Sequence, residues 1–160
     1  MRAEFTVPGV PMGKQRPRFK QEGKYVRTYT PHKTVVYENL IRMEYERQCS
    51  GVFFQKDVPV SIEVTAYYGI PKSTSKKKVW QMLSWLIRPL KRPDLDNVLK
   101  AVLDACNGVV FHDDAQVTDI RASKYYGDIP RVDVIISEAK ERLIINQSEQ
   151  QQATQEQVEE

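Results

Sequence analysis

The stretch that decides the fold is "RPDLDNVLKAVLDACNGVVFHDDAQV", residues 92–117, which reads as a buried helix followed by the start of a strand. Apolar side chains recur at helical spacing after Asp96, and Gly108 supplies a stop signal. We therefore predict a helix over about 97–107. The same stretch gathers five aspartates in a chain of net charge +3, and this concentration of acid needs an explanation.

The patterns on either side of this stretch predict a mixed sheet. Residues 58–70 alternate β-branched and aromatic side chains with polar ones, and residues 4–9 read as a first strand cut off by a turn. Residues 115–127 and 130–138 predict the two strands of a hairpin around "GDIP". This order favours an α/β fold of the α+β kind, a mixed sheet with helices packed on it, over a doubly wound parallel sheet.

Three further helices are predicted. One spans 32–49 after a threonine–proline start at 30–31, a short one spans about 75–85, and a short terminal one spans 139–146. The packing side of the first is expected to hold Val36, Leu40 and Met43. Between the first strand and the first helix, residues 13–31 alternate basic and aromatic side chains, as in an extended loop or hairpin with a basic face.

Length and composition fit one soluble domain over 1–145, with a disordered Gln/Glu-rich tail over 146–160. Once the four tail glutamates are set aside from the 21 acidic residues, 17 acids remain against 24 bases, so polyanions are plausible partners. Cys49 and Cys106 lack disulfide or zinc spacing. No apolar run suits a membrane span and no signal peptide is visible, so we expect a cytoplasmic protein with no membrane partner.

The aspartates fall into two pairs. Asp94 and Asp96 stand at i and i+2 in the extended approach to a helix, so their carboxylates can converge. A purely structural interpretation is that they cap the helix and favour its positive end. If Asp114 returns to them through the segment 108–113, three carboxylates share a small space and repel one another.

A divalent cation relieves this repulsion. Oxygen ligands in a partly hydrated site suit Mg²⁺, with Mn²⁺ as a substitute, whereas Zn²⁺ usually recruits His or Cys. Beside a basic surface, such a site predicts phosphodiester hydrolysis. Lys100 lies on the same helical face as Asp96, either as its i,i+4 partner or as a stabiliser of the phosphoryl transition state. Asn97 and Asp113 are candidates to hold the ligating carboxylates in place, while Asp104 faces solvent or supports the site.

The order "RPDLDNVLKAVLDA", "FHDDAQV" and then a strand with Lys124 resembles the RusA family of Holliday-junction endodeoxyribonucleases, over roughly residues 4–137. The resemblance implies a mixed α/β homodimer that makes paired, symmetric nicks in four-way DNA junctions with magnesium, in recombination and repair. By motif position it implies Asp94, Asp96 and Asp114 as metal ligands and Lys100 as the catalytic lysine. "GKQRPRF" also looks like the basic N-terminal segment of many members, whereas the tail and the segment around "KKKVWQMLSW" depart from the family.

Two basic runs flank the acidic cluster and are candidates to follow a DNA backbone, although such runs are often only solvated surface. The candidate DNA-binding residues are Lys14, Arg16, Arg18, Lys20, Lys76, Lys77, Lys78 and Arg92. Phe19, Trp80 and Trp85 can stack on unpaired bases, but core packing or a dimer contact is the expected place of both tryptophans. His112 is a weaker candidate for proton transfer.

Two alternatives stay open at this point. One is a non-catalytic nucleic-acid-binding module whose aspartates are caps and turn formers, so that Asp94→Asn has no effect. The other is a glycosyltransferase with a metal-binding D-x-D motif, although the chain is small for a sugar-nucleotide domain.

Overall fold

The computed structural model describes residues 1–16 and 18–140. Its core is a four-stranded sheet of order β1-β6-β4-β5, formed by β1 (Arg2–Pro8), β6 (Arg131–Glu138), β4 (Val60–Gly69) and β5 (Val117–Gly127). The helices are α1 (His32–Cys49), α2 (Lys76–Leu83) and α3 (Leu95–Cys106), and a short 3₁₀ turn, η1 (Asp114–Gln116), precedes β5. The mixed sheet with packed helices confirms the predicted α+β class.

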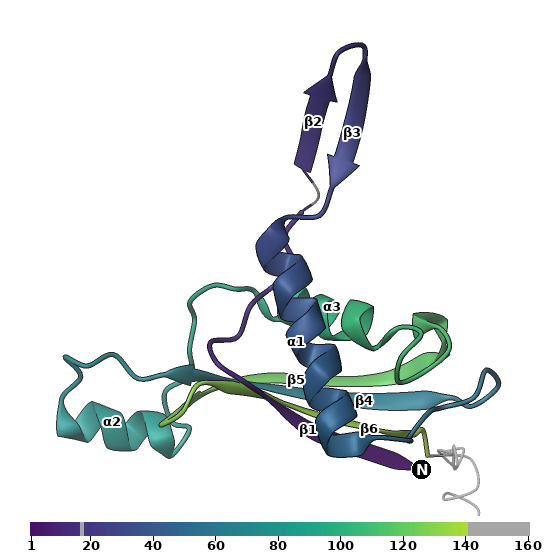
Figure 1. The fold of residues 1–160 in the computed structure, drawn as a ribbon. Coiled ribbons are helices and arrows are strands. Elements are labelled where there is room, and N and C mark those ends of the chain that lie inside the picture. Colours follow the sequence, from purple (N-terminus) through teal and green to yellow (C-terminus); the bar gives the residue numbers. More distant parts are fainter. Residues whose placement is uncertain (17, 141–160) are drawn as a thin grey trace, which may run out of the picture.

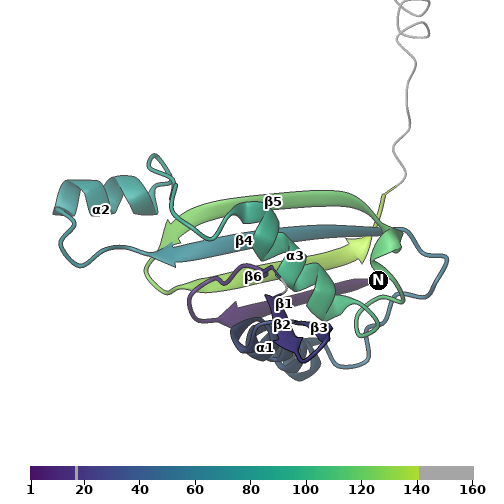
Figure 2. The same ribbon diagram turned by 90° about the horizontal axis from the view of Figure 1, so that it is seen from above.

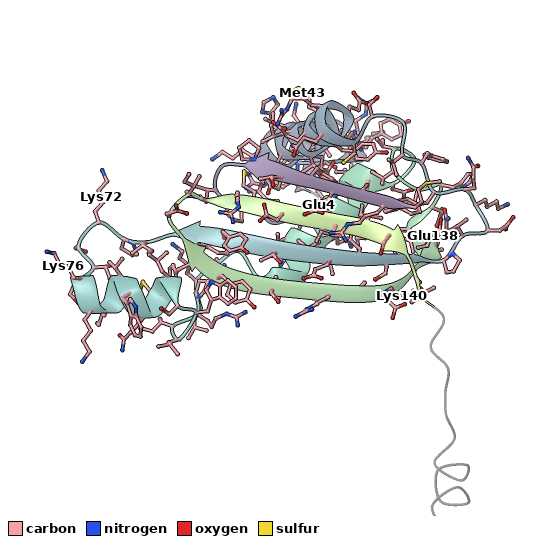
Figure 3. The ribbon with its side chains drawn as sticks, turned by 90° about the horizontal axis from the view of Figure 1, so that it is seen from below. Glu4, Met43, Lys72, Lys76, Glu138 and Lys140 are labelled. Carbon is pink, nitrogen blue, oxygen red and sulfur yellow. The ribbon has the colours of Figure 1, made fainter. Side chains whose placement is uncertain are left out.

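Period-two alternation explains how the sheet carries its helices. In β4 every second side chain, from Val60 to Tyr68, is buried, and the same holds for β1 and β6. These side chains meet α1 and α3, which both lie on one face of the sheet (Figures 1 and 2). In the described part of the chain the opposite face carries no helix and presents mainly polar side chains, as the view from below shows (Figure 3).

The predicted hairpin of the last two strands is wrong. β5 pairs only with β4, in parallel, whereas β6 lies between β1 and β4 and is antiparallel to both. The connection from β5 to β6 therefore passes across the end of β4, where Pro130 packs closely on Gly69. Turn chemistry fixes the reversal of the chain, but it does not fix whether a third strand enters between the two arms.

The span predicted for α1 is confirmed, but its predicted packing side is wrong. Val36 and Met43 are exposed, and the buried side consists of Thr34, Tyr37, Ile41, Glu44 and Tyr45. Two tyrosine rings supply most of its apolar area, and Glu44 is tolerated there because Arg47 and Gln48 donate to its carboxylate. The helix N-cap is Pro31 itself, so the proline precedes the first helical residue instead of lying in the first turn.

The segment before α1 forms a two-stranded ribbon, β2 (Arg18–Glu22) and β3 (Tyr25–Tyr29), which projects beyond the helix and away from the sheet (Figure 1). The predicted terminal helix falls almost entirely outside the described residues, as does the tail over 146–160. None of the helices in the described part of the chain has the length and apolar character needed to cross a bilayer.

Candidate functional site

The D-x-D motif lies at the start of α3. Asp94 is the helix N-cap residue and Asp96 lies in the first turn, both exposed. The Asp94 side chain makes no capping hydrogen bond, and among the described residues neither carboxylate has an ion-pair or hydrogen-bond partner. The capping part of the structural interpretation is therefore not realised, although both acids lie at the positive end of the helix, and two carboxylates stay available to a ligand.

The loop that leads into Asp94 is anchored to the carboxyl end of β4 and to β5. The Lys124 ammonium donates to the carbonyl oxygens of Lys91, at 2.7 Å, and Pro93, at 2.9 Å. The Tyr68 hydroxyl donates to the same Pro93 oxygen at 3.3 Å. Burial, helped by the nearby charges of Tyr37 and Asp94, raises the pKa of Tyr68 to about 12, so the hydroxyl keeps its proton.

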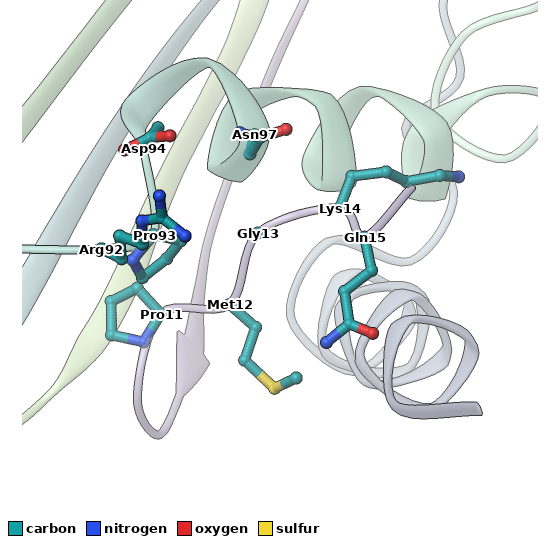
Figure 4. Close-up of a pocket in the computed structure, with 9 residues that line it drawn as sticks. All are labelled: Pro11, Met12, Gly13, Lys14, Gln15, Arg92, Pro93, Asp94 and Asn97. Carbon is teal, nitrogen blue, oxygen red and sulfur yellow. The ribbon is translucent and has the colours of Figure 1, made fainter. Parts of the chain in front are cut away.

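A strap formed by residues 10–15 packs across the start of α3 (Figure 4). The Lys14 amide donates to the Asn97 carbonyl at 2.8 Å, and Gly13 lies so close that an added Cβ would be 2.9 Å from the Cβ atoms of both Asn97 and Pro93. The strap and the motif together line an open pocket of about 450 Å³, which includes Arg92 and Asp94. Glycine at position 13 is thus required by close approach.

An ion triad holds the strap to both helices. The Lys14 ammonium lies 2.8 Å from Glu38 of α1 and 2.5 Å from Asp104 of α3. Burial lowers the pKa of Lys14, but hydrogen bonds and charge attraction from these two carboxylates outweigh that effect and leave it raised. Asp104 is thereby a partner of the strap. Contact of Lys14 with DNA stays a prediction, and its ammonium already has two carboxylate partners.

The second aspartate pair lies at the other end of the sheet. Asp113 and Asp114 precede β5 where Val117 pairs with Val60, whereas Tyr68 and Pro93 meet at the opposite end of β4. The eight residue steps between Val60 and Tyr68 correspond to about 26 Å of strand. Within the described residues no group of three acidic, histidine or cysteine side chains is placed to hold a metal. Contrary to the expectation from the sequence, one chain therefore does not bring Asp114 to Asp94 and Asp96.

The members of the second pair differ from each other. The Asp113 carboxylate accepts from the Ala115 amide at 2.9 Å, and the Gln116 side chain accepts from the Asp113 amide at 3.0 Å, which completes a capping box for η1. Asp113 thus has a local structural role, far from the carboxylates it was expected to support. Asp114 is exposed and has no partner among the described residues, and exposed His112 lines a separate pocket beside it.

Lys100 points into solvent from the same helix as the D-x-D motif. It is exposed, and no ion pair joins it to Asp96 within the described chain, so the simple i,i+4 interpretation is not realised. Asn97 is half-buried and contacts the strap. The roles of these residues in metal binding and catalysis stay predictions.

The family model described as "Endodeoxyribonuclease RusA" matches residues 8–137. The chain belongs to the RusA family. A Bacillus subtilis relative, "Uncharacterized protein YqaN", is 36% identical over 137 residues, which cover 84% of this chain and 95% of that protein. A Lactococcus phage r1t protein, "Crossover junction endodeoxyribonuclease rusA", is 26% identical over 136 residues with the same coverage. The resemblance inferred from the motifs is confirmed, and with it the class of enzyme, an endodeoxyribonuclease.

The remaining basic candidates of this RusA-family chain lie on two projections. Arg16, Arg18 and Lys20 lie on or beside the ribbon, and Lys76, Lys77 and Lys78 form the first turn of α2. Figure 3 shows α2 beyond the end of the sheet. Neither tryptophan lies in the core, since Trp80 is 63% exposed and Trp85 is 54% exposed, so of the two expected places only a dimer contact stays a prediction. The Trp85 ring instead lies tilted against Tyr125, at 4.7 Å between centroids, with Arg88 over the same Tyr125 ring, which fixes the base of α2 to β5.

Two supporting residues of the site were missed. Lys124 was noted only as part of the family pattern, because the sequence pattern paired its strand with the wrong neighbour. In the structure it lies opposite Ala66 near the carboxyl end of β4, which brings its ammonium to the loop. Gly13 carried no signal beyond its residue type, because its role depends on the approach of α3 from 80 residues along the chain.

Proposed function

We propose that this protein is a homodimeric, magnesium-dependent nuclease that resolves four-way DNA junctions by paired symmetric nicks. The observation that carries the proposal is a pair of carboxylates, Asp94 and Asp96, at the start of α3 in a RusA-family chain, with no partner among the described residues. Because neither carboxylate makes a capping hydrogen bond in the described part of the chain, both can bind a metal cation. The relative named as a crossover junction endodeoxyribonuclease supports the choice of substrate.

The donor set fits a divalent cation of the magnesium type. Mg²⁺ prefers oxygen ligands, keeps several waters and is usually held by one or two carboxylates together with substrate phosphates. Asp94 and Asp96 supply two such carboxylates, both exposed to an approaching phosphate. When bound, the ion supplies charge neutralisation of the phosphoryl group and lowers the pKa of coordinated water.

The cationic side chains around the motif have separate tasks. Lys100, one turn after Asp96 and free to move, offers its ammonium to the phosphate oxygens as negative charge grows in the transition state. Arg92 faces the pocket beside Asp94 and positions the DNA backbone. Lys124 does not reach the substrate in this role, because its ammonium holds the loop carbonyls and so positions Asp94.

The third ligand, Asp114, enters the site from the partner subunit in this proposal. β5 is an edge strand, and a partly apolar surface lies between the two aspartate pairs, formed by half-buried Leu99 and Leu103 of α3 and by Ile120 of β5, which is 53% exposed. A two-fold axis through this surface would place the Asp114 end of one subunit beside the Asp94 end of the other. The symmetry yields two equal sites, as paired nicks require.

Cleavage of a synthetic four-way junction, compared with linear duplex under Mg²⁺, Mn²⁺ and a chelator, tests the activity. We expect two symmetric nicks in the junction with either metal and none with the chelator. Well-folded protein that cuts no branched DNA under any divalent metal would refute the proposal.

Mixing two inactive variants tests the shared site. Subunits with Asp96→Asn and subunits with Asp114→Asn are each expected to be inactive alone. After random exchange, half the dimers are mixed, and each mixed dimer keeps one intact site, so about a quarter of wild-type nicking should return. If all three carboxylates came from one chain, every site would carry a lesion and the mixture would stay inactive.

A further inference from the structure

The β2–β3 ribbon has two chemically different faces. Its register pairs Arg18 with Tyr29, Lys20 with Arg27 and Glu22 with Tyr25, so one face holds three cationic positions, one acidic position and two tyrosines. The other face carries Phe19 opposite Thr28, and Val26 opposite Gln21. Phe19 is 73% exposed and Val26 is 65% exposed.

The cationic face is arranged for an anion. Lys20 and Arg27 are directly opposite each other on this face. Arg18 lies two residues from Lys20 on the same face. Three cations in a row at this spacing suit a line of phosphates, as expected for a segment that follows a nucleic-acid backbone.

The apolar face has no cover from the described part of the chain. The strands of the ribbon pair only with each other, and Figure 1 shows them projecting past α1 into solvent. A lone two-stranded ribbon is marginally stable in water, so contact with a partner is needed to hold it. Phe19 and Val26 are diagonal neighbours on this face and together form a short apolar patch. We call this pair of side chains the apolar edge.

The electrostatics select the occupant of the apolar edge. Because the opposite face of the ribbon is cationic, a partner that covers both faces must offer phosphates on one side of the ribbon and apolar surface on the other. These two surfaces must be separated by no more than the thickness of the ribbon. Nucleic acid offers both, as phosphates on its backbone and as the flat faces of bases, and apolar side chains such as Phe can insert between base steps. At a four-way junction, the base pairs beside the crossover each present a face that regular stacking does not cover.

We propose that the ribbon enters the centre of the junction, with Arg18, Lys20 and Arg27 along the phosphates and with Phe19 and Val26 against the base pair at the crossover. The apolar edge acts as a wedge that keeps this pair unstacked while the strands are cut. This inference rests on the proposed function, because it takes a four-way junction as the substrate.

The test compares the double variant Phe19→Ala, Val26→Ala with wild type on two junctions, one fully paired and one with unpaired nucleotides at the crossover. Stacking of an aromatic side chain on a base is worth about 1–3 kcal/mol, so nicking of the paired junction should fall about 5- to 100-fold. The pre-opened junction should be nicked within about twofold of the wild-type rate, since it needs no wedge. Phe19→Tyr should retain activity on both.

A second readout does not require cleavage. With chelator present, wild type should increase the fluorescence of 2-aminopurine placed at the crossover, and the double variant should not. Leu90→Ala, a change at an apolar residue that is 95% exposed outside the ribbon, is the matched control and should behave as wild type in both assays.

Three results would overturn the wedge. The double variant could lose activity equally on both junctions, it could leave the fluorescence increase intact, or it could lower the mass of the dimer in sedimentation, which would assign the apolar edge to a contact between copies. If wild type cuts neither junction, the proposed function fails, while the fluorescence experiment still decides whether the ribbon opens the crossover.

Discussion

The two aspartate pairs at opposite ends of β4 and β5 are built from the same residue type and used differently. At the start of η1, Asp113 satisfies a backbone amide and is itself held by Gln116, so its charge is accounted for by local structure. At the start of α3, Asp94 occupies the same kind of position without making the capping bond. The comparison shows that hydrogen-bond partners, more than spacing, separate a structural aspartate from one that is available for chemistry.

The largest effect should come from Asp96→Asn, which removes a charge without breaking a contact. Nicking should fall at least about 100-fold, because metal-assisted stabilisation of charge is worth several kcal/mol. The melting temperature should stay unchanged, since the carboxylate has no partner among the described residues. Asp128→Asn, in the exposed turn before β6, is the control and should keep wild-type activity. A loss for both variants, or for neither, would contradict a specific role of the Asp96 carboxylate.

Lys124→Met tests whether catalysis depends on the hydrogen bonds that hold the loop before Asp94. Without the ammonium, the carbonyls of Lys91 and Pro93 lose their donor and the loop before Asp94 loosens. We expect kcat to fall about 10- to 100-fold with a smaller change in KM, together with weaker dependence on added Mg²⁺ at low concentration. Steady-state kinetics over a magnesium series measures both. A change confined to KM would instead indicate direct contact of Lys124 with DNA.

Gly13→Ala tests the close contact between the strap and α3. The new methyl would be 2.9 Å from two Cβ atoms, so the strap must shift. Such overpacking should lower the free energy of unfolding by about 1–3 kcal/mol and reduce nicking through the displaced Asp94 loop. Urea unfolding and the junction assay measure the two effects. Gln15→Ala, two residues along the same strap, is the control, and equal losses for both would argue against a specific steric contact.

Asp113→Ala tests the structural role of the aspartate that caps η1. Loss of the cap should lower the free energy of unfolding by about 1 kcal/mol, and Asp113→Asn should restore most of it because asparagine also caps well. Nicking per folded molecule should change little. A large loss of activity in the asparagine variant would return Asp113 to the catalytic site.

The smallest effect concerns pH and the ion triad. The pKa of Lys14 is raised in the folded protein by its two carboxylates, so the triad stabilises the protein below the ordinary lysine pKa of 10.5 and is lost as the pH rises further. Wild type should therefore be more stable than Lys14→Met at neutral pH, and the difference should vanish in alkaline solution above this range. Thermal unfolding across a pH series measures it. A constant difference would assign the effect to side-chain packing.

Local patterns predicted most elements of this fold but not their neighbours. The span of the helix over 32–49 and the central strand follow from the proline at the helix start and from the alternation in the strand, each within one short segment. The place of β6 between β1 and β4 could not be predicted, because β5 and β6 carry the same alternation whether they pair or leave room for a third strand. Because that pairing determines where Lys124 lies, the contact of Lys124 with the loop before Asp94 could not be predicted either.

The candidate site was predictable as a motif but not as a geometry. The D-x-D signal predicted two carboxylates at a helix start, but Asp96 lies inside the first turn of α3 and not in the extended approach that was expected. The expected return of Asp114 failed because α3 carries the chain away from the Asp94 end of β4, and η1 then begins β5 beside Val60 at the opposite end. Spacing along the sequence gives the number of acidic side chains, but only the fold shows which of them lie on one surface of a single chain.

The order of the strands bears on synthesis of the protein. β6 is the last strand to leave the ribosome, yet it is the one that joins β1 to the rest of the sheet. Until residues 131–138 emerge, the first strand of the nascent chain has no neighbour and the floor beneath α1 and α3 is incomplete. A chain stalled before this point would already contain every acidic residue of the proposed site, but without a rigid floor it would be unable to cut DNA.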